Sequence, residues 1–158
     1  MTLTDDARLV SGFTLLAVPT IMYGGFTLFG IVTQDIAGSQ PGGLTLSETQ
    51  AALWRAGHAH AGVWLILSLI IQVLLDSTRL SRALQWLARI SAPLGAVSVS
   101  AGFFGVAFVA AFRWLLYFGA ISMAIAVAVT GVGLLRSVTV TGVGLQRSAI
   151  DRDSIDMN

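Results

Sequence analysis

Four long apolar runs constrain what this chain can fold into more than any other feature of its sequence. They lie at about residues 11–33, 57–75, 90–112 and 114–135. A helix needs about 20 apolar residues to cross the hydrocarbon core of a bilayer. Only 11% of the 158 residues are charged and 55% are hydrophobic, which is too little polar surface for a water-soluble fold. The sequence therefore predicts an all-α, integral membrane four-helix bundle that lies in a lipid bilayer.

The arginines predict the orientation of this bundle. All nine basic residues are arginines. Seven lie on one side of the predicted spans: Arg8, Arg79, Arg82, Arg89, Arg136, Arg147 and Arg152. Arg55 and Arg113 lie on the other side, and positive residues are enriched in cytoplasmic loops. We therefore expect both termini to be cytoplasmic. Arginine without lysine is typical of a GC-rich bacterial source, so the expected location is the bacterial inner membrane.

The segments outside the spans carry their own signals. Residues 1–148 are expected to form one transmembrane domain and residues 149–158 a flexible tail. Ser47 and Gln50 have the spacing of a capping box, which predicts a helix that begins in the outer loop, after a turn-rich linker at residues 37–43. Residues 77–89 have the leucine spacing of an interfacial amphipathic helix. Asp76 is expected to pair with Arg79.

Composition excludes several classes of function. The chain has no cysteine, which excludes disulfides, thiolate metal sites and iron–sulfur clusters. The net charge is +1, and no basic stripe suggests a nucleic-acid partner. No pair of nucleophile and base is visible, so the sequence identifies no catalytic residue and leaves open whether the protein is an enzyme.

The two histidines, His58 and His60, lie near the predicted outer end of the second span. Ionisable residues at membrane depth are costly and usually functional. Residues i and i+2 point about 200° apart on a helix, so we expect each histidine to have a different partner unless the helix is unwound. Small neighbours, alanine and glycine, leave room beside the helix for a flat molecule such as a porphyrin, or for another helix.

The segment Arg55–Trp64 has the pattern Arg-x-x-His-x-His-x-Gly. This pattern resembles a histidine-bearing helix of heme-copper oxidase catalytic subunits, and also helices of NnrS-like proteins and of small four-helix bacterial membrane proteins. The resemblance implies that His58 or His60 is an axial heme ligand near the outer face. The chain departs from the oxidases because it has no further histidine for a second axial bond or for copper.

Heme b is the first cofactor that this pattern suggests. The sixth ligand of the iron would be the other histidine, Met22, Met123 or a histidine of a second subunit. Arg55 and Arg113 could pair with the heme propionates, and Trp64 and Tyr117 could line the porphyrin.

Copper or zinc is the second cofactor to consider. The ligands would be His58, His60 and either Glu48 or Asp35, which requires the outer loop to fold back over the helix. A third possibility is proton transfer by a histidine that titrates near neutral pH.

These alternatives predict a small membrane protein in electron transfer, redox sensing or a respiratory-type complex. The rival reading is a cofactor-free accessory or structural subunit whose histidines only hydrogen-bond between helices. Another rival is a small oligomeric transporter. Small residues on the helix faces favour close helix association, so we expect a homo-oligomer or a larger membrane complex.

Overall fold

The structure of the chain is a computed structural model that describes residues 3–33 and 45–156. All regular structure in these two ranges is helical. The helices are α1 (Asp5–Leu16), α2 (Val18–Val32), α4 (Glu48–Leu75), α5 (Arg82–Val106), the 3-10 turn η2 (Ala110–Phe112) and α6 (Arg113–Asp156). Four helical segments are long and apolar enough to cross a membrane: Asp5–Ile31, Glu48–Leu75, Arg82–Val106 and Ala110–Val138. The predicted all-helical class with four candidate spans is confirmed.

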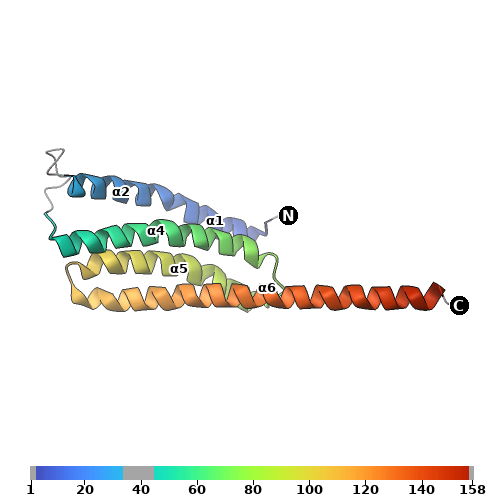
Figure 1. Cartoon of the computed structure of the whole chain (residues 1–158). Helices are drawn as coiled ribbons and strands as arrows, with labels where there is room; N and C mark the ends of the chain where they lie inside the picture. The colour runs from blue at the N-terminus through green and yellow to red at the C-terminus, as the bar shows by residue number, and fades with distance from the viewer. Residues whose placement is uncertain (1–2, 34–44, 157–158) are drawn as a thin grey trace.

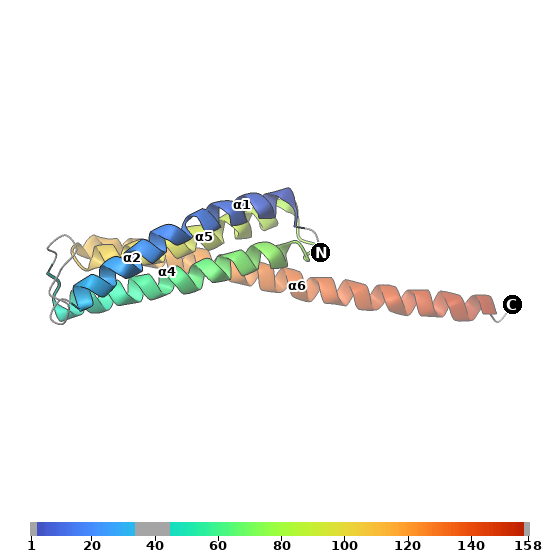
Figure 2. The same ribbon diagram turned by 90° about the horizontal axis from the view of Figure 1, so that it is seen from above.

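The helices form a row in which each element packs against its neighbour in the chain (Figure 1). α5 packs against both α4 and α6, and the first span, made of α1 and α2, lies on the side of α4 and α5 that faces away from α6. Seen from above, the first span crosses α4 and α5 diagonally (Figure 2). α1 contacts both of these helices, whereas α2 contacts α4 and not α5. This difference leaves space between α2 and α5.

The two ends of the bundle differ in their connections. The start of α1 and the turn between α4 and α5 lie at one end, which we call the Arg89 end (Figure 1). The end of α2, the start of α4 and the turn between α5 and α6 lie at the other, which we call the His58 end. α6 continues past the bundle at the Arg89 end as a helix to Asp156. The flexible tail predicted for residues 149–158 stays a prediction.

The start of α4 is the best-predicted boundary. The Ser47 hydroxyl accepts a hydrogen bond from the Gln50 N–H, and the Gln50 side chain accepts one from the Ser47 N–H, so the capping box is present. α4 then continues without a break through Gly57. The Gln50 side chain also donates to the carbonyl of Ala107 at 3.0 Å, which fastens the start of α4 to the turn that follows α5. The linker predicted at residues 37–43 lies outside the described residues.

Two boundaries of α5 differ from the sequence prediction. α5 begins at Arg82 rather than Ile90, so residues 82–89 are its first two turns and not a separate interfacial helix. It ends at Val106 rather than Phe112, and the turn to α6 lies at residues 107–112. The earlier start arises because Arg89 is buried inside the bundle, while its charge marks it in the sequence as a loop residue.

Glycines bring α5 and α6 close together, as the small-residue pattern predicts. A Cβ atom on Gly119 would lie 2.6 Å from the backbone nitrogen of Val99, and one on Gly102 would lie 2.8 Å from that of Leu116. Gly95 lies against Gly119, whose carbonyl oxygen would be 2.9 Å from the added Cβ. These backbone contacts fix the α5–α6 pair that forms one side of the bundle.

The first span is interrupted at Ala17, between α1 and α2. The Ala17 N–H donates to the Thr14 carbonyl at 3.2 Å, and the Thr20 N–H donates to the Ala17 carbonyl at 3.1 Å. Both are three-residue bonds in place of the four-residue bonds of an α-helix. Pro19 has no N–H to donate to Leu15. The break at Ala17 is therefore explained by lost helical hydrogen bonds, whereas α5 continues as a helix through Pro93.

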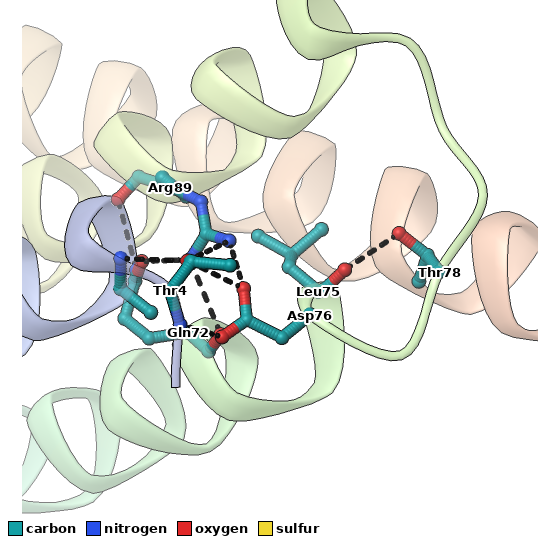
Figure 3. Close-up of polar contacts among 7 residues, drawn as sticks. Thr4, Gln72, Leu75, Asp76, Thr78 and Arg89 are labelled. Atoms are coloured by element: carbon teal, nitrogen blue, oxygen red, sulfur yellow. Dashed lines mark hydrogen bonds and ion pairs between the residues drawn. The ribbon is translucent and has the colours of Figure 1, made fainter. Parts of the chain in front are cut away.

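A buried ion pair fastens the first span at the Arg89 end (Figure 3). The Arg89 guanidinium donates to the Asp76 carboxylate, and their side chains are 1% and 4% exposed. Asp76 also accepts hydrogen bonds from the Thr4 N–H at 2.9 Å and the Thr4 hydroxyl at 2.8 Å. Arg89 donates in addition to the Gln72 carbonyl and side-chain oxygens, each at 3.2 Å. The predicted pairing of Asp76 with Arg79 is wrong, because Arg89 reaches Asp76 across the turn between α4 and α5.

Thr4 belongs to both this cluster and α1. Its hydroxyl caps α1 by accepting a hydrogen bond from the Ala7 N–H at 3.2 Å. Burial alone raises the pKa of Asp76, but the hydrogen bonds from Thr4 and Arg89 lower it by more, so the pKa of Asp76 lies below its ordinary value of 3.8. The carboxylate is therefore ionised at neutral pH and holds the first residues of α1 against α4 and α5.

Candidate functional site

The two histidines of α4 lie on different faces of the helix. His58 contacts the first span and His60 contacts α5. Because α4 is a regular helix at this point, residues two apart point in nearly opposite directions. The prediction that each histidine has a different partner is confirmed, and the alternative of an unwound helix is wrong.

His60 is held by its own helix and by aromatic rings. Its Nδ1 lies 2.8 Å from the Ala56 carbonyl oxygen. Since a carbonyl oxygen can only accept, Nδ1 carries the proton and Nε2 is left as an acceptor or ligand. The ring packs on Phe103 with centroids 4.9 Å apart and on Trp64 at 5.7 Å. A shallow cavity of about 320 Å³, also lined by Tyr117, lies beside it.

His58 lies beside a pocket of about 270 Å³ between the first span, α4 and α5. Its ring packs against Gly25 of α2 so closely that a Cβ on Gly25 would lie 2.7 Å from the imidazole Cε1. The remaining lining residues are small or apolar: Ala17, Thr20, Ile21, Gly24, Ala61, Leu65, Ala96, Val97, Ser100, Ala101 and Phe104. The pocket fills the space that α2 leaves by packing on α4 and not on α5.

Among the residues that line this pocket, His58 is the one available hydrogen-bond donor. The hydroxyls of Thr20 and Ser100 donate to the carbonyls of Ala17 and Ala96, at 2.6 and 2.8 Å. Among the residues that the structure describes, none forms a hydrogen bond with His58, and no other lining residue is ionisable. A guest in the pocket therefore meets one imidazole in an otherwise apolar environment.

A second cavity, of about 220 Å³, lies next to the first along the same span. It shares Ala17, Leu65, Ala96 and Val97 with the His58 pocket and extends toward Val10, Phe13, Thr14 and Pro93. The two neighbouring cavities together extend along the first span, from His58 past the break at Ala17 to Val10. This shape favours a narrow molecule with a polar head and an apolar chain.

The predicted copper or zinc ligands do not come together. Glu48 is the first residue of α4 and exposed, ten residues before His58 and so about 15 Å away along the helix axis. Among the side chains of residues 3–31 and 45–138, no group of three or more from His, Cys, Asp or Glu could hold a metal ion. His58, His60 and Glu48 thus do not form one metal site in this structure. The alternative ligand Asp35 lies outside the described residues.

The predicted heme-contacting residues are also dispersed. Arg55 and Arg113 are exposed, and the Arg113 guanidinium lies 5.5 Å from the centroid of the Trp114 ring. Trp64 and Tyr117 line the His60 cavity and not the His58 pocket. Met123 is buried in the core between α5 and α6, and Met22 is exposed on α2, so neither methionine lines either histidine's cavity.

Comparison with known proteins assigns this chain to no family. No family model, curated protein or solved structure matches the chain. The resemblance of residues 55–64 to the oxidase helix stays a prediction.

Sequence reasoning missed the partners of His58. Gly25 belongs to a Gly-Gly pair in the first span, and such pairs in apolar helices mark places where another element comes close. That signal was present, but it does not specify which element approaches. The cavity itself depends on how far α2 diverges from α5, which is a property of tertiary packing.

Proposed function

We propose that this chain is a multi-pass protein of the bacterial inner membrane that binds an elongated, membrane-soluble molecule beneath its first span. The guest has a hydrogen-bonding head and an apolar chain, and quinones are the redox-active molecules with this chemistry. One observation carries the proposal: His58 is the available polar group of an apolar pocket that lies next to a second apolar cavity and shares four lining residues with it.

The chemistry of the pocket supports a carbonyl head. An imidazole N–H donates to a carbonyl oxygen, and a ligand that leaves a buried polar group unpaired binds more weakly. Small-molecule sites are mostly apolar, with a few polar groups that fix orientation. The elongated shape supports a chain. Heme at His58 has less support, because the rings predicted to line the porphyrin, Trp64 and Tyr117, line the His60 cavity instead.

The proposed orientation places both termini in the cytoplasm and His58 toward the outer leaflet. The positive-inside rule supports it, although Arg89 no longer contributes, because its charge is paired with Asp76 inside the bundle. Six of the nine arginines still lie on the cytoplasmic side in this orientation. The guest would then reach His58 from the outer half of the bilayer.

Heme b is a second candidate, and the geometry of His60 favours it. Metal-ligating histidines usually donate their second ring N–H to a carbonyl or carboxylate, as the His60 Nδ1 does to Ala56. Bound iron would supply one-electron chemistry, while His60 would hold it and Trp64 and Tyr117 would line one face. The absorption spectrum of the purified protein tests this candidate: a Soret band that is lost in His60→Leu supports it, and a spectrum without one rejects it.

Fluorescence quenching tests the quinone proposal. Quinones quench tryptophan, and Trp54 packs edge-on against Phe104 of the pocket with centroids 5.3 Å apart. We expect a decyl-chain benzoquinone to quench the protein saturably in lipid nanodiscs. Losing one hydrogen bond of about 1 kcal/mol or slightly more should weaken binding roughly 5- to 10-fold in His58→Leu.

The matched controls separate head recognition from apolar partitioning. His58→Gln keeps a donor and should retain most of the affinity, and His60→Leu should bind as the wild type does. Decane, which has no polar head and does not quench, reports on the chain alone when it competes with the quinone. If His58→Leu and His60→Leu bind the quinone equally well, the proposal is wrong.

A further inference from the structure

The first span is fastened to the rest of the bundle at its two ends and spans the cavities between them. At the Arg89 end, Thr4 holds the start of α1 against Asp76 and Arg89 through three hydrogen bonds. At the His58 end, α2 rests on α4 through the contact between Gly25 and the His58 ring. The His58 pocket and its continuation lie between these two attachments.

The two attachments differ in strength. The one at Thr4 combines a buried ion pair with direct hydrogen bonds, and α1 packs against both α4 and α5. The one at Gly25 is a van der Waals contact with a single ring, and α2 packs against α4 alone. No hydrogen bond between α2 and another helix is found within residues 18–33. α2 is therefore much easier to displace than α1.

The break in the first span lies between the two attachments. Ala17 lines both cavities, and the helical hydrogen bonds are interrupted there because Pro19 has no N–H. Hinges are typically a few residues at the ends of helices that absorb changes in backbone angles. A rotation at Ala17–Pro19 would move α2 without disturbing α1 or the buried ion pair.

We propose that α2 is a gate that turns about Ala17–Pro19 and opens the His58 pocket sideways, while α1 remains fixed by Thr4, Asp76 and Arg89. In the closed position Gly25 covers the His58 ring. In the open position α2 moves away from α4, and the guest enters through the gap between α2 and α5. The identity of the molecule that passes the gate rests on the proposed function, whereas the movement of α2 does not.

Paired spin labels test the gate, and the chain suits them because it has no native cysteine. One pair, Phe29→Cys with Ile121→Cys, reports on α2 against α6, and a second, Leu9→Cys with Val132→Cys, reports on α1 against α6. All four side chains are exposed. We expect pulsed dipolar spectroscopy in nanodiscs of phosphatidylethanolamine and phosphatidylglycerol to give two distances for the α2 pair and one for the α1 pair.

Pro19→Ala restores the missing N–H and should remove the longer distance of the α2 pair, while the neighbouring Val18→Ala should keep it. Adding the decyl-chain benzoquinone should change the ratio of the two α2 distances and leave the α1 pair unchanged. A single α2 distance in the wild type, or an α1 pair that shifts together with the α2 pair, overturns the gate.

Quenching titrations on the same samples keep the two proposals apart. If the quinone binds and α2 gives one distance, the gate is wrong and the proposed function stands. If α2 gives two distances and the quinone does not bind, the gate stands and the proposed function is wrong.

Discussion

Replacing Asp76 with Asn removes one charge from a pair whose side chains are 1% and 4% exposed. Breaking a buried ion pair by removing one partner typically costs about 3–5 kcal/mol, because the other charge stays buried without compensation. Thr4, on one side of the pair, is exposed, so water can partly solvate Arg89. We therefore expect the lower end, about 3 kcal/mol, which is roughly a 150-fold change in the unfolding equilibrium.

The assay is reversible unfolding in mixed micelles, titrated with sodium dodecyl sulfate and followed by circular dichroism. Asp5→Asn is the matched control, since Asp5 makes an exposed pair with Arg8 at 3.3 Å and its loss should change nothing measurable. Because replacing a whole buried pair by apolar residues is often neutral, Asp76→Leu with Arg89→Met should be more stable than Asp76→Leu alone. Equal stability of Asp76→Asn and Asp5→Asn would refute the reasoning.

The same carboxylate predicts how stability depends on pH. The pKa of Asp76 is lower in the folded chain than its ordinary value of 3.8, so the unfolded state binds more protons as the pH falls. The contribution of Asp76 is fully present above about pH 5 and is lost as the pH falls through the folded-state pKa. The difference in unfolding free energy between wild type and Asp76→Asn should therefore be constant near neutral pH and shrink below pH 3.8. A difference that grows on acidification would contradict this assignment.

Two glycine substitutions test the packing that shapes the site. Gly25→Ala places a Cβ 2.7 Å from the His58 ring, so the ring must shift and quinone binding should weaken roughly as in His58→Leu, by 5- to 10-fold. Gly12→Ala lies in the same span, has nothing within 4 Å of the added Cβ and should leave binding unchanged. Equal quinone affinities of Gly25→Ala and Gly12→Ala would reject the contact between Gly25 and His58. Gly119→Ala should destabilise the bundle by about 1–3 kcal/mol, because its Cβ meets the backbone of α5. Gly131→Ala, whose Cβ meets nothing within 4 Å, should not. Unfolding titrations measure both variants.

Local signals in the sequence predicted the elements of the fold well. The four apolar runs correspond to the four candidate spans, and the Ser47–Gln50 spacing gave the start of α4 because a capping box involves only residues within one helical turn. Arg89 could not be placed in this way. Its charge resembles that of the neighbouring loop arginines, and its burial depends on Asp76 and Gln72, which lie on another helix.

The candidate site was predictable to a similar degree. Helical geometry alone placed His58 and His60 on different faces of α4, because the angle between residues two apart is fixed. It could not show that Ala56 binds His60 while His58 faces a cavity, because the cavity depends on the divergence of α2 from α5. The predicted metal ligand set was wrong because Glu48 is close to His58 in the sequence but not in space, since α4 is continuous between them.

Nuclear magnetic resonance of the protein labelled with nitrogen-15 in histidine tests the central claim most directly, since the chain has two histidines and therefore four ring nitrogens. The His60→Gln variant assigns the signals. We predict that His60 is protonated at Nδ1 before and after the decyl-chain benzoquinone is added, and that the ring nitrogens of His58 shift as binding saturates. Saturable binding with the His58 signals unmoved would contradict the account.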